Sequence, residues 1–154
     1  MKPLDFAISQ IGKEEIPRGS NWGEHVQKYL KSVGINFPAS WCMAFVYWCF
    51  EEWELISGIQ NPLIKTGGVL HMWNTIPAKY KIVKGISALP GDIFIIDFGK
   101  GLGHTGFVEF IEDGILHTIE GNTNDTGSRE GYEVCRRTRN TSTIKGYIRI
   151  PITV

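Results

Sequence analysis

The chain has 154 residues with 16 basic and 16 acidic side chains, so its formal net charge is zero. This length suits one compact domain, which we expect to cover residues 1–154. Nucleic acid is not an expected partner, because proteins that bind it carry a basic stripe. No apolar run approaches the ~18–20 residues that cross a bilayer, so we expect no membrane insertion.

The first residues and the cysteines bear on the compartment. Met1–Phe6 has no apolar core of the kind found in signal peptides, and Asp5 interrupts it. We therefore expect synthesis in the cytoplasm without a classical signal peptide. Three cysteines, an odd number in such a context, predict free thiols and no disulfide framework.

The first half of the chain has helical periodicity. The second helix is expected to start at Ser20 or Asn21, where Glu24 would complete a capping box. The third is apolar on every side, which predicts a buried central helix capped by Ser40. The four helices are expected at residues 4–11, 20–33, 40–50 and 69–74.

After Pro90-Gly91 the apolar pattern changes to strands separated by Gly, Asn and Asp. Helices followed by strands predict the α+β class, with an antiparallel sheet packed against the apolar helix. The strands are expected at residues 92–98, 104–111, 115–120, 132–138 and 144–150.

Cys42 lies in the first turn of the predicted buried helix. Unpaired N–H groups and the positive end of the helix dipole favour a reactive thiolate there. The alternative is a buried structural cysteine, and position alone does not separate the two. Cys49 lies mid-helix with nothing to activate it, and a structural role is expected for Cys135 as well.

A nucleophilic cysteine needs a base, and the sequence offers four histidines. His104 is the best placed, because it follows the glycine-rich segment Gly99–Gly103, which leaves room for a substrate. His25 falls on a polar helix face, His71 lies in a short helix, and His117 lies within a strand. A lone histidine is more often structural, so position alone does not decide.

The hairpin that follows His104 supplies the deciding argument. A three-residue loop over 112–114 would place His104 opposite Asn122, and Gly106 opposite Glu120, on one face. Glu120 or Asn122 could then hold the imidazole tautomer. The alternative is a merely polar strand end.

The register of this hairpin depends on its turn. A two-residue Asp113-Gly114 turn would pair Glu112 with Ile115 and turn Glu120 away from the site. We therefore predict the three-residue loop.

Five segments in this order resemble the CHAP family of cysteine- and histidine-dependent amidohydrolases and peptidases, relatives of NlpC-type wall peptidases and, more distantly, of papain. The likeness runs from about residue 11 to 148 and is typical of phage and prophage members. The segments are Gly12–Pro17 with Ser20–Gly23, Trp41–Val46, Leu89–Ile93, Gly103–Val108 and Ile119–Asn122.

The resemblance implies a papain-like or NlpC-like fold and a peptidoglycan hydrolase. Cys42 would be the nucleophile, His104 the base and Glu120 the third residue, with Asn122 orienting the site or polarising the substrate. The bond cleaved would be the muramoyl–alanine amide or one within the stem or cross-bridge peptide. A holin, phage particle or secretion apparatus would deliver the enzyme to the wall, or an immunity protein would accompany it.

Three tryptophans are candidate sugar-binding residues, namely Trp22, Trp41 and Trp73, although Trp41 also fits the core. No cofactor or metal is expected: residues 36–40 lack the carboxylates of the calcium loop found before the cysteine in some family members. The rival hypotheses are a cysteine protease or toxin with a non-wall substrate, and an inactive wall-binding module.

Overall fold

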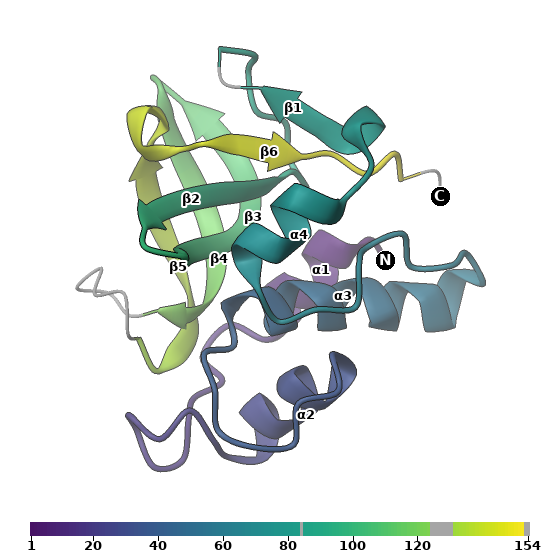
Figure 1. Cartoon of the computed structure of the whole chain (residues 1–154), viewed down its shortest axis with the longest axis vertical. Coiled ribbons are helices and arrows are strands. Elements are labelled where there is room, and N and C mark those ends of the chain that lie inside the picture. Colours follow the sequence, from purple (N-terminus) through teal and green to yellow (C-terminus); the bar gives the residue numbers. More distant parts are fainter. Residues whose placement is uncertain (84, 124–130, 153–154) are drawn as a thin grey trace.

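The structure is a computed structural model that describes residues 1–83, 85–123 and 131–152. The predicted α+β class is confirmed, with helices first and a six-stranded antiparallel sheet after them (Figure 1). The helices are α1 (Pro3–Ser9), α2 (Glu24–Ser32), α3 (Cys42–Ser57) and α4 (Val69–Thr75), with short 3-10 turns at Ala78–Tyr80 and Thr141–Thr143. The strands are β1 (Lys81–Val83), β2 (Ile93–Gly99), β3 (Leu102–Glu112), β4 (Ile115–Thr123), β5 (Glu133–Asn140) and β6 (Gly146–Ile148).

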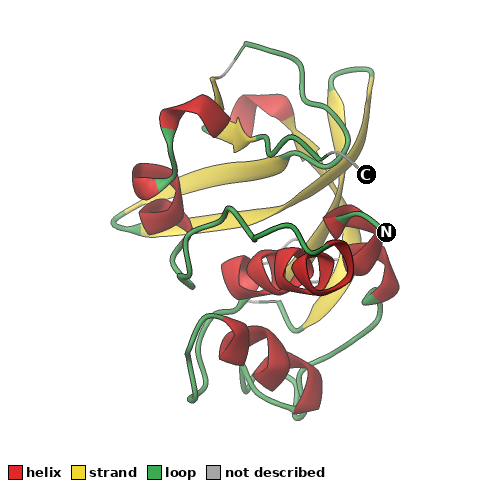
Figure 2. Ribbon diagram, turned by 90° about the vertical axis from the view of Figure 1, so that its right-hand side faces the viewer, coloured by secondary structure: helices red, strands yellow, loops and turns green. Residues whose placement is uncertain are grey.

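The strand order is β1-β6-β2-β3-β4-β5. One face packs on α3 through β3 and β4 and on α4 through β2, and its residues Ile95, Phe107 and Ile119 belong to the main core. Figure 2 shows the resulting layers, with α3 between the sheet and α2. In the described part of the chain, no helix is long and apolar enough to cross a membrane.

The other face of the sheet has a smaller core of its own, formed by seven residues: Ala88, Phe94, Ile96, Val108, Leu116, Ile144 and Tyr147. Successive side chains on a strand alternate between faces, so these strands bury apolar residues on both sides. This explains why residues 93–96 form an unbroken apolar run whose side chains are all buried.

The central helix α3 is longer than predicted. It begins at Cys42 and not at Ser40, and it runs on to Ser57, where Gly58 ends it in the left-handed conformation with φ 73°. Beyond Phe50 the helix is acidic on its outer side, but Trp53 still faces the core, and this one-sided burial sustains about two more turns.

The start predicted for the second helix is wrong. The helix begins at Glu24, and residues 20–22 form part of a turn instead. The Ser20 hydroxyl donates to the Pro17 carbonyl at 2.5 Å, and the Ile16 N–H donates to the Trp22 carbonyl at 2.9 Å. These bonds to the preceding loop compete with the capping box that the sequence suggested.

The turn predicted for the β3–β4 hairpin is also wrong. Glu112 pairs with Ile115 across a two-residue Asp113-Gly114 turn whose residues both have positive φ, 53° and 74°. A bulge between Val108 and Phe110 then shifts the ladder by one residue.

Beyond this bulge Phe107 pairs with Ile119, which is the register that the three-residue loop would have produced. An added Cβ on Gly106 would lie 2.8 Å from Cγ of Glu120, so these two residues are neighbours. The bulge thus compensates for the shorter turn before the ladder reaches the site.

Candidate functional site

A cleft of about 170 Å³ opens where the start of α3 meets the β2–β3 turn and the segment before α4. Four glycines line it, which keeps side chains out of the entrance and leaves room for an extended chain. The cleft is lined by Ser40, Cys42, Gly67, Gly68, Val69, Gly101, Leu102, Gly103, His104 and Asn122.

Cys42 is the first residue of α3 and is 5% exposed. Its sulfur therefore lies beside the unpaired N–H groups of the first helical turn. The alternatives for Cys42 in the sequence were a nucleophile and a core thiol, and the structure places it in the cleft wall.

His104 is buried near the start of β3, where it pairs with Ile96 of β2. Its Nε2 lies 2.8 Å from Oε1 of Glu120, and Cys42 is close enough to the imidazole to raise its pKa. Burial lowers the pKa of His104, but the hydrogen bonds to Cys42 and Glu120 and their charges outweigh it and raise the pKa to about 9. The ring thus bridges the sulfur and the carboxylate.

Glu120 is completely buried in β4. Its carboxylate accepts hydrogen bonds from Arg139 on β5, at 2.6 and 2.9 Å, and from the Thr118 hydroxyl at 2.7 Å, in addition to its contact with His104. Burial raises the pKa of Glu120, but the bonds from Arg139 and His104 and their positive charges lower it to about 2. The carboxylate therefore stays ionised inside the protein.

Asn122 follows Glu120 in a left-handed conformation with φ 56°, at a break in the β4–β5 ladder. Its side chain is buried in the cleft wall, and its Oδ1 has no hydrogen-bond partner among the described residues. A buried amide oxygen without a partner costs free energy, which a bound ligand could recover by donating an N–H to it.

The three candidate tryptophans lie outside the cleft. Trp41 is fully buried, stacks on Tyr29 with ring centroids 5.5 Å apart, and donates its indole N–H to Glu15 at 2.8 Å. Proposing Trp41 as a substrate-binding residue is therefore wrong, because its ring has no free face. Trp22 and Trp73 are partly buried against the main core.

Sequence reasoning gave no role to Arg139, Thr118 or Glu15, although all three support the site. Glu15 was quoted only as part of a motif, and on β5 a role was assigned to Cys135 alone, a structural one. The signal for Arg139 is its place on the strand after β4. The ladder pairs Arg139 with Leu116, however, and only the side-chain hydrogen bonds show that it reaches Glu120.

The other two cysteines take no part in the cleft. All three cysteines are free, as predicted. Cys49 is fully buried in α3, and burial raises the pKa of its thiol well above the ordinary value. It is thus an inert thiol on the same helix as Cys42.

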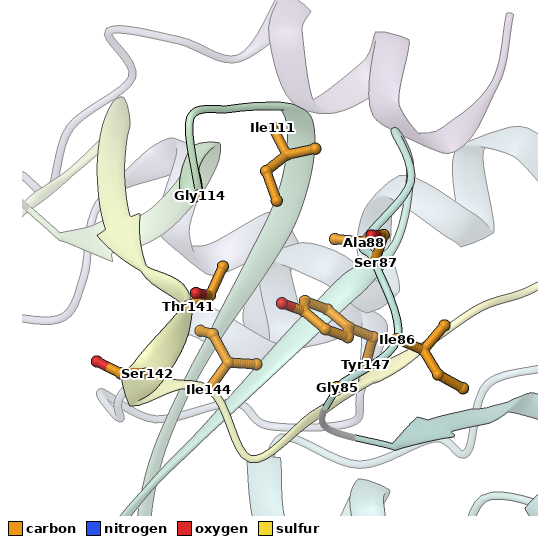
Figure 3. A pocket seen from close by; sticks show the side chains of 10 residues that line it. All are labelled: Gly85, Ile86, Ser87, Ala88, Ile111, Gly114, Thr141, Ser142, Ile144 and Tyr147. Atoms are coloured by element: carbon orange, nitrogen blue, oxygen red, sulfur yellow. The ribbon is translucent and has the colours of Figure 1, made fainter.

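A larger cavity of about 350 Å³ lies on the far face of the sheet, at the β3–β4 turn (Figure 3). Ile111, Ile144 and Tyr147 are among its lining residues, and of the lining residues that the structure describes only the tyrosine is titratable. The volume of a cavity alone therefore does not identify the functional site in this protein. Within the described residues, no group of three or more His, Cys, Asp or Glu side chains could hold a metal ion.

Comparisons with known proteins agree with this geometry. A family model described as the CHAP domain matches residues 33–122, which is 90 of the 154 residues. A solved structure titled as the wild-type endolysin LysIME-EF1 superposes with a TM-score of 0.57 at 19% identity, over 97% of this chain. This chain covers 62% of that structure's chain. A search of curated sequences found no significant match.

Proposed function

The chain belongs to the CHAP family of cysteine- and histidine-dependent amidohydrolases and peptidases, and we propose that it hydrolyses an amide bond of peptidoglycan through an acyl-enzyme on Cys42. The observation that carries the proposal is the continuous contact from Cys42 through His104 to Glu120, at the wall of a narrow cleft. The fold shared with an endolysin supports the choice of substrate.

The first half of the reaction forms the acyl-enzyme. His104 takes the proton of Cys42, and the thiolate attacks the amide carbonyl to form a carbon–sulfur bond. When the carbon–nitrogen bond breaks, the imidazolium gives its proton to the leaving amine. The Cys42 backbone N–H at the start of α3 stabilises the oxyanion.

The second half releases the product. His104 removes a proton from water, the resulting hydroxide attacks the thioester, and the thiolate leaves and recovers its proton. Glu120 holds the ring by accepting at Nε2, so the other nitrogen faces Cys42. Asn122 contacts the substrate through its amide Oδ1, which has no hydrogen-bond partner within the described part of the chain.

The cleft supports a substrate of small residues. Among the lining residues that the structure describes, His104 and Cys42 are the only ionisable side chains, and the glycines Gly67, Gly68, Gly101 and Gly103 leave part of the wall as bare backbone. Both proposed bond classes, the muramoyl–alanine amide and a stem or cross-bridge peptide bond, fit such a cleft. A holin, a phage particle or a secretion apparatus is the delivery partner that we propose brings the enzyme to the wall.

The test is digestion of purified sacculi with several cross-link types, read by mass spectrometry. We expect the wild type to release fragments whose masses identify the bond, and Cys42→Ala to release none. Cys49→Ala is the matched control, because it removes a thiol from the same helix outside the cleft, and it should remain active.

If Cys42→Ala released fragments as well as the wild type does, the assignment of Cys42 as the nucleophile would be refuted. A folded wild type that releases nothing from any sacculus would overturn the choice of peptidoglycan as the substrate.

A further inference from the structure

Arg139 on β5 forms an ion pair with the carboxylate of Glu120 on the neighbouring strand β4, the proposed orienting residue. Its Nη2 lies 2.6 Å from Oε1 of Glu120 and its Nε lies 2.9 Å from Oε2, so the guanidinium meets both oxygens as a fork. The Arg139 side chain is 17% exposed and Glu120 is fully buried. Nothing in the mechanism above uses this arginine.

We propose that Arg139, assisted by Thr118, is a positioning residue that locks the Glu120 carboxylate against His104 and limits how strongly that carboxylate holds the imidazole proton. The inference rests on the proposed roles of Cys42, His104 and Glu120. It adds a specific pair of side chains to the site, and it makes predictions that differ from those for a purely structural ion pair.

The geometry accounts for both oxygens of the carboxylate. Oε1 contacts His104 and Arg139, while Oε2 accepts from Thr118 and Arg139. With each oxygen held by two partners, the carboxylate cannot rotate away from the imidazole. A single glutamate–histidine contact would leave this rotation free.

The charges around the carboxylate explain the second part of the proposal. The titratable groups that face Glu120 within the described residues are His104 from β3, with Cys42 of α3 beyond it, and Arg139 and Cys135 from β5. Arg139 is the one permanently charged cation in this described set. It neutralises part of the negative charge that would otherwise bind the His104 proton too tightly for transfer to a leaving group.

The same strand offers a comparison. Arg136 makes a fork of similar geometry with Glu109, at 3.0 and 3.1 Å, but the Arg136 side chain is 56% exposed and is not one of the cleft-lining residues. Arg136 is thus a matched control in residue type, strand and bonding.

The experiment measures alkylation of Cys42 by iodoacetamide as a function of pH, with the modified peptide followed by mass spectrometry. This readout needs no wall substrate. Loss of a nearby positive charge raises the pKa of every acid around it, so in Arg139→Met the pH midpoint of Cys42 alkylation should rise by about one pH unit or more. Arg136→Met should keep the wild-type midpoint.

Arg139→Lys separates charge from geometry. It keeps the cation but loses the fork, so the alkylation midpoint should stay near that of the wild type while sacculus digestion slows by about tenfold, the scale of a mispositioned general base. It also decides the question if Arg139→Met melts too low to be assayed.

An unchanged midpoint in folded Arg139→Met, or full digestion by Arg139→Lys, would overturn the proposal and make Arg139 a structural residue only. Failure of the wild type to digest sacculi would instead refute the proposed substrate, and it would leave the alkylation comparison as the deciding result for Arg139.

Discussion

His104 and Glu120 stabilise each other in opposite protonation states. The pKa of His104 rises from its ordinary value of 6.5 to about 9, and that of Glu120 falls from 4.5 to about 2, because each is buried beside the other's charge, with Cys42 and Arg139 at the two ends. The pair therefore contributes to folding only while the imidazole is protonated and the carboxylate is ionised.

The sign of the pH dependence follows from these directions. The contribution of His104 is present in full below about pH 6.5 and disappears as pH rises through about 9, whereas that of Glu120 is present above 4.5 and disappears as pH falls toward 2. Between pH 6 and 9.5, the free energy of unfolding should fall by roughly 2 kcal/mol more in the wild type than in His104→Gln. Urea denaturation at a series of pH values measures this, and equal falls would contradict it.

At the scale of elements, the site depends on how closely α3 approaches β4. Gly121 makes this approach, since a Cβ there would lie 2.8 Å from Cζ3 of Trp41 and 2.9 Å from Cβ of Phe45. Phe45 lies one turn after Cys42, on the same helix. Gly121 therefore sets the distance between the strand that carries Glu120 and the helix that carries the thiol.

We expect Gly121→Ala to push the start of α3 away from the sheet. Overpacking of this kind costs about 1–3 kcal/mol, and Cys42 alkylation at neutral pH should slow because His104 no longer meets the sulfur. Gly114→Ala is the control: its φ is 74° and no atom lies near its added Cβ, so it should cost about 1–2 kcal/mol while alkylation stays at the wild-type rate. If Cys42 is alkylated at the same rate in both variants, Gly121 does not set the distance between the helix and the strand of the site.

At the scale of the whole molecule, the N-terminal segment joins the helices to the far edge of the sheet. Backbone bonds connect Gly12 and Lys13 to Val134 in β5, and Glu15 to Tyr132 just before that strand. The buried Glu15 side chain also accepts from the Trp41 indole and from the Gly19 N–H, both at 2.8 Å. The Glu15 carboxylate thus joins its own segment both to the Gly19 backbone and to Trp41, the residue that precedes Cys42 in the sequence.

Replacing Glu15 with alanine should therefore destabilise the whole fold. It leaves the buried Trp41 indole N–H without an acceptor and also removes the bond from the Gly19 N–H, so the expected loss is about 1–3 kcal/mol in denaturant unfolding. Glu14→Ala tests the adjacent residue, whose partner Arg18 is exposed, and its unfolding midpoint should not change. Comparable losses in the two variants would show that the Glu15–Trp41 bond has no special weight.

Sequence periodicity was sufficient for the class of the fold and for most elements. The buried helix, the strands after Pro90 and the place of Cys42 at a helix start all follow from local patterns, because burial imposes a period on each element. β1 was missed, since three residues at a sheet edge carry no periodic signal. The second helix was started too early because its turn depends on bonds to Ile16 and Pro17.

Residue types and order determined the candidate site, and the resemblance to a known family followed from them. Cys42, His104, Glu120 and Asn122 could be selected from the sequence, but their contacts depend on a bulge beside Glu109 that corrects the ladder after a two-residue turn. A bulge leaves no mark in a pattern of period two, because it is stabilised by pairing with another strand. Arg139 and Glu15 escaped for the same reason: a buried ion pair or hydrogen bond joins residues 19 or 26 positions apart, and only the folded chain brings them together.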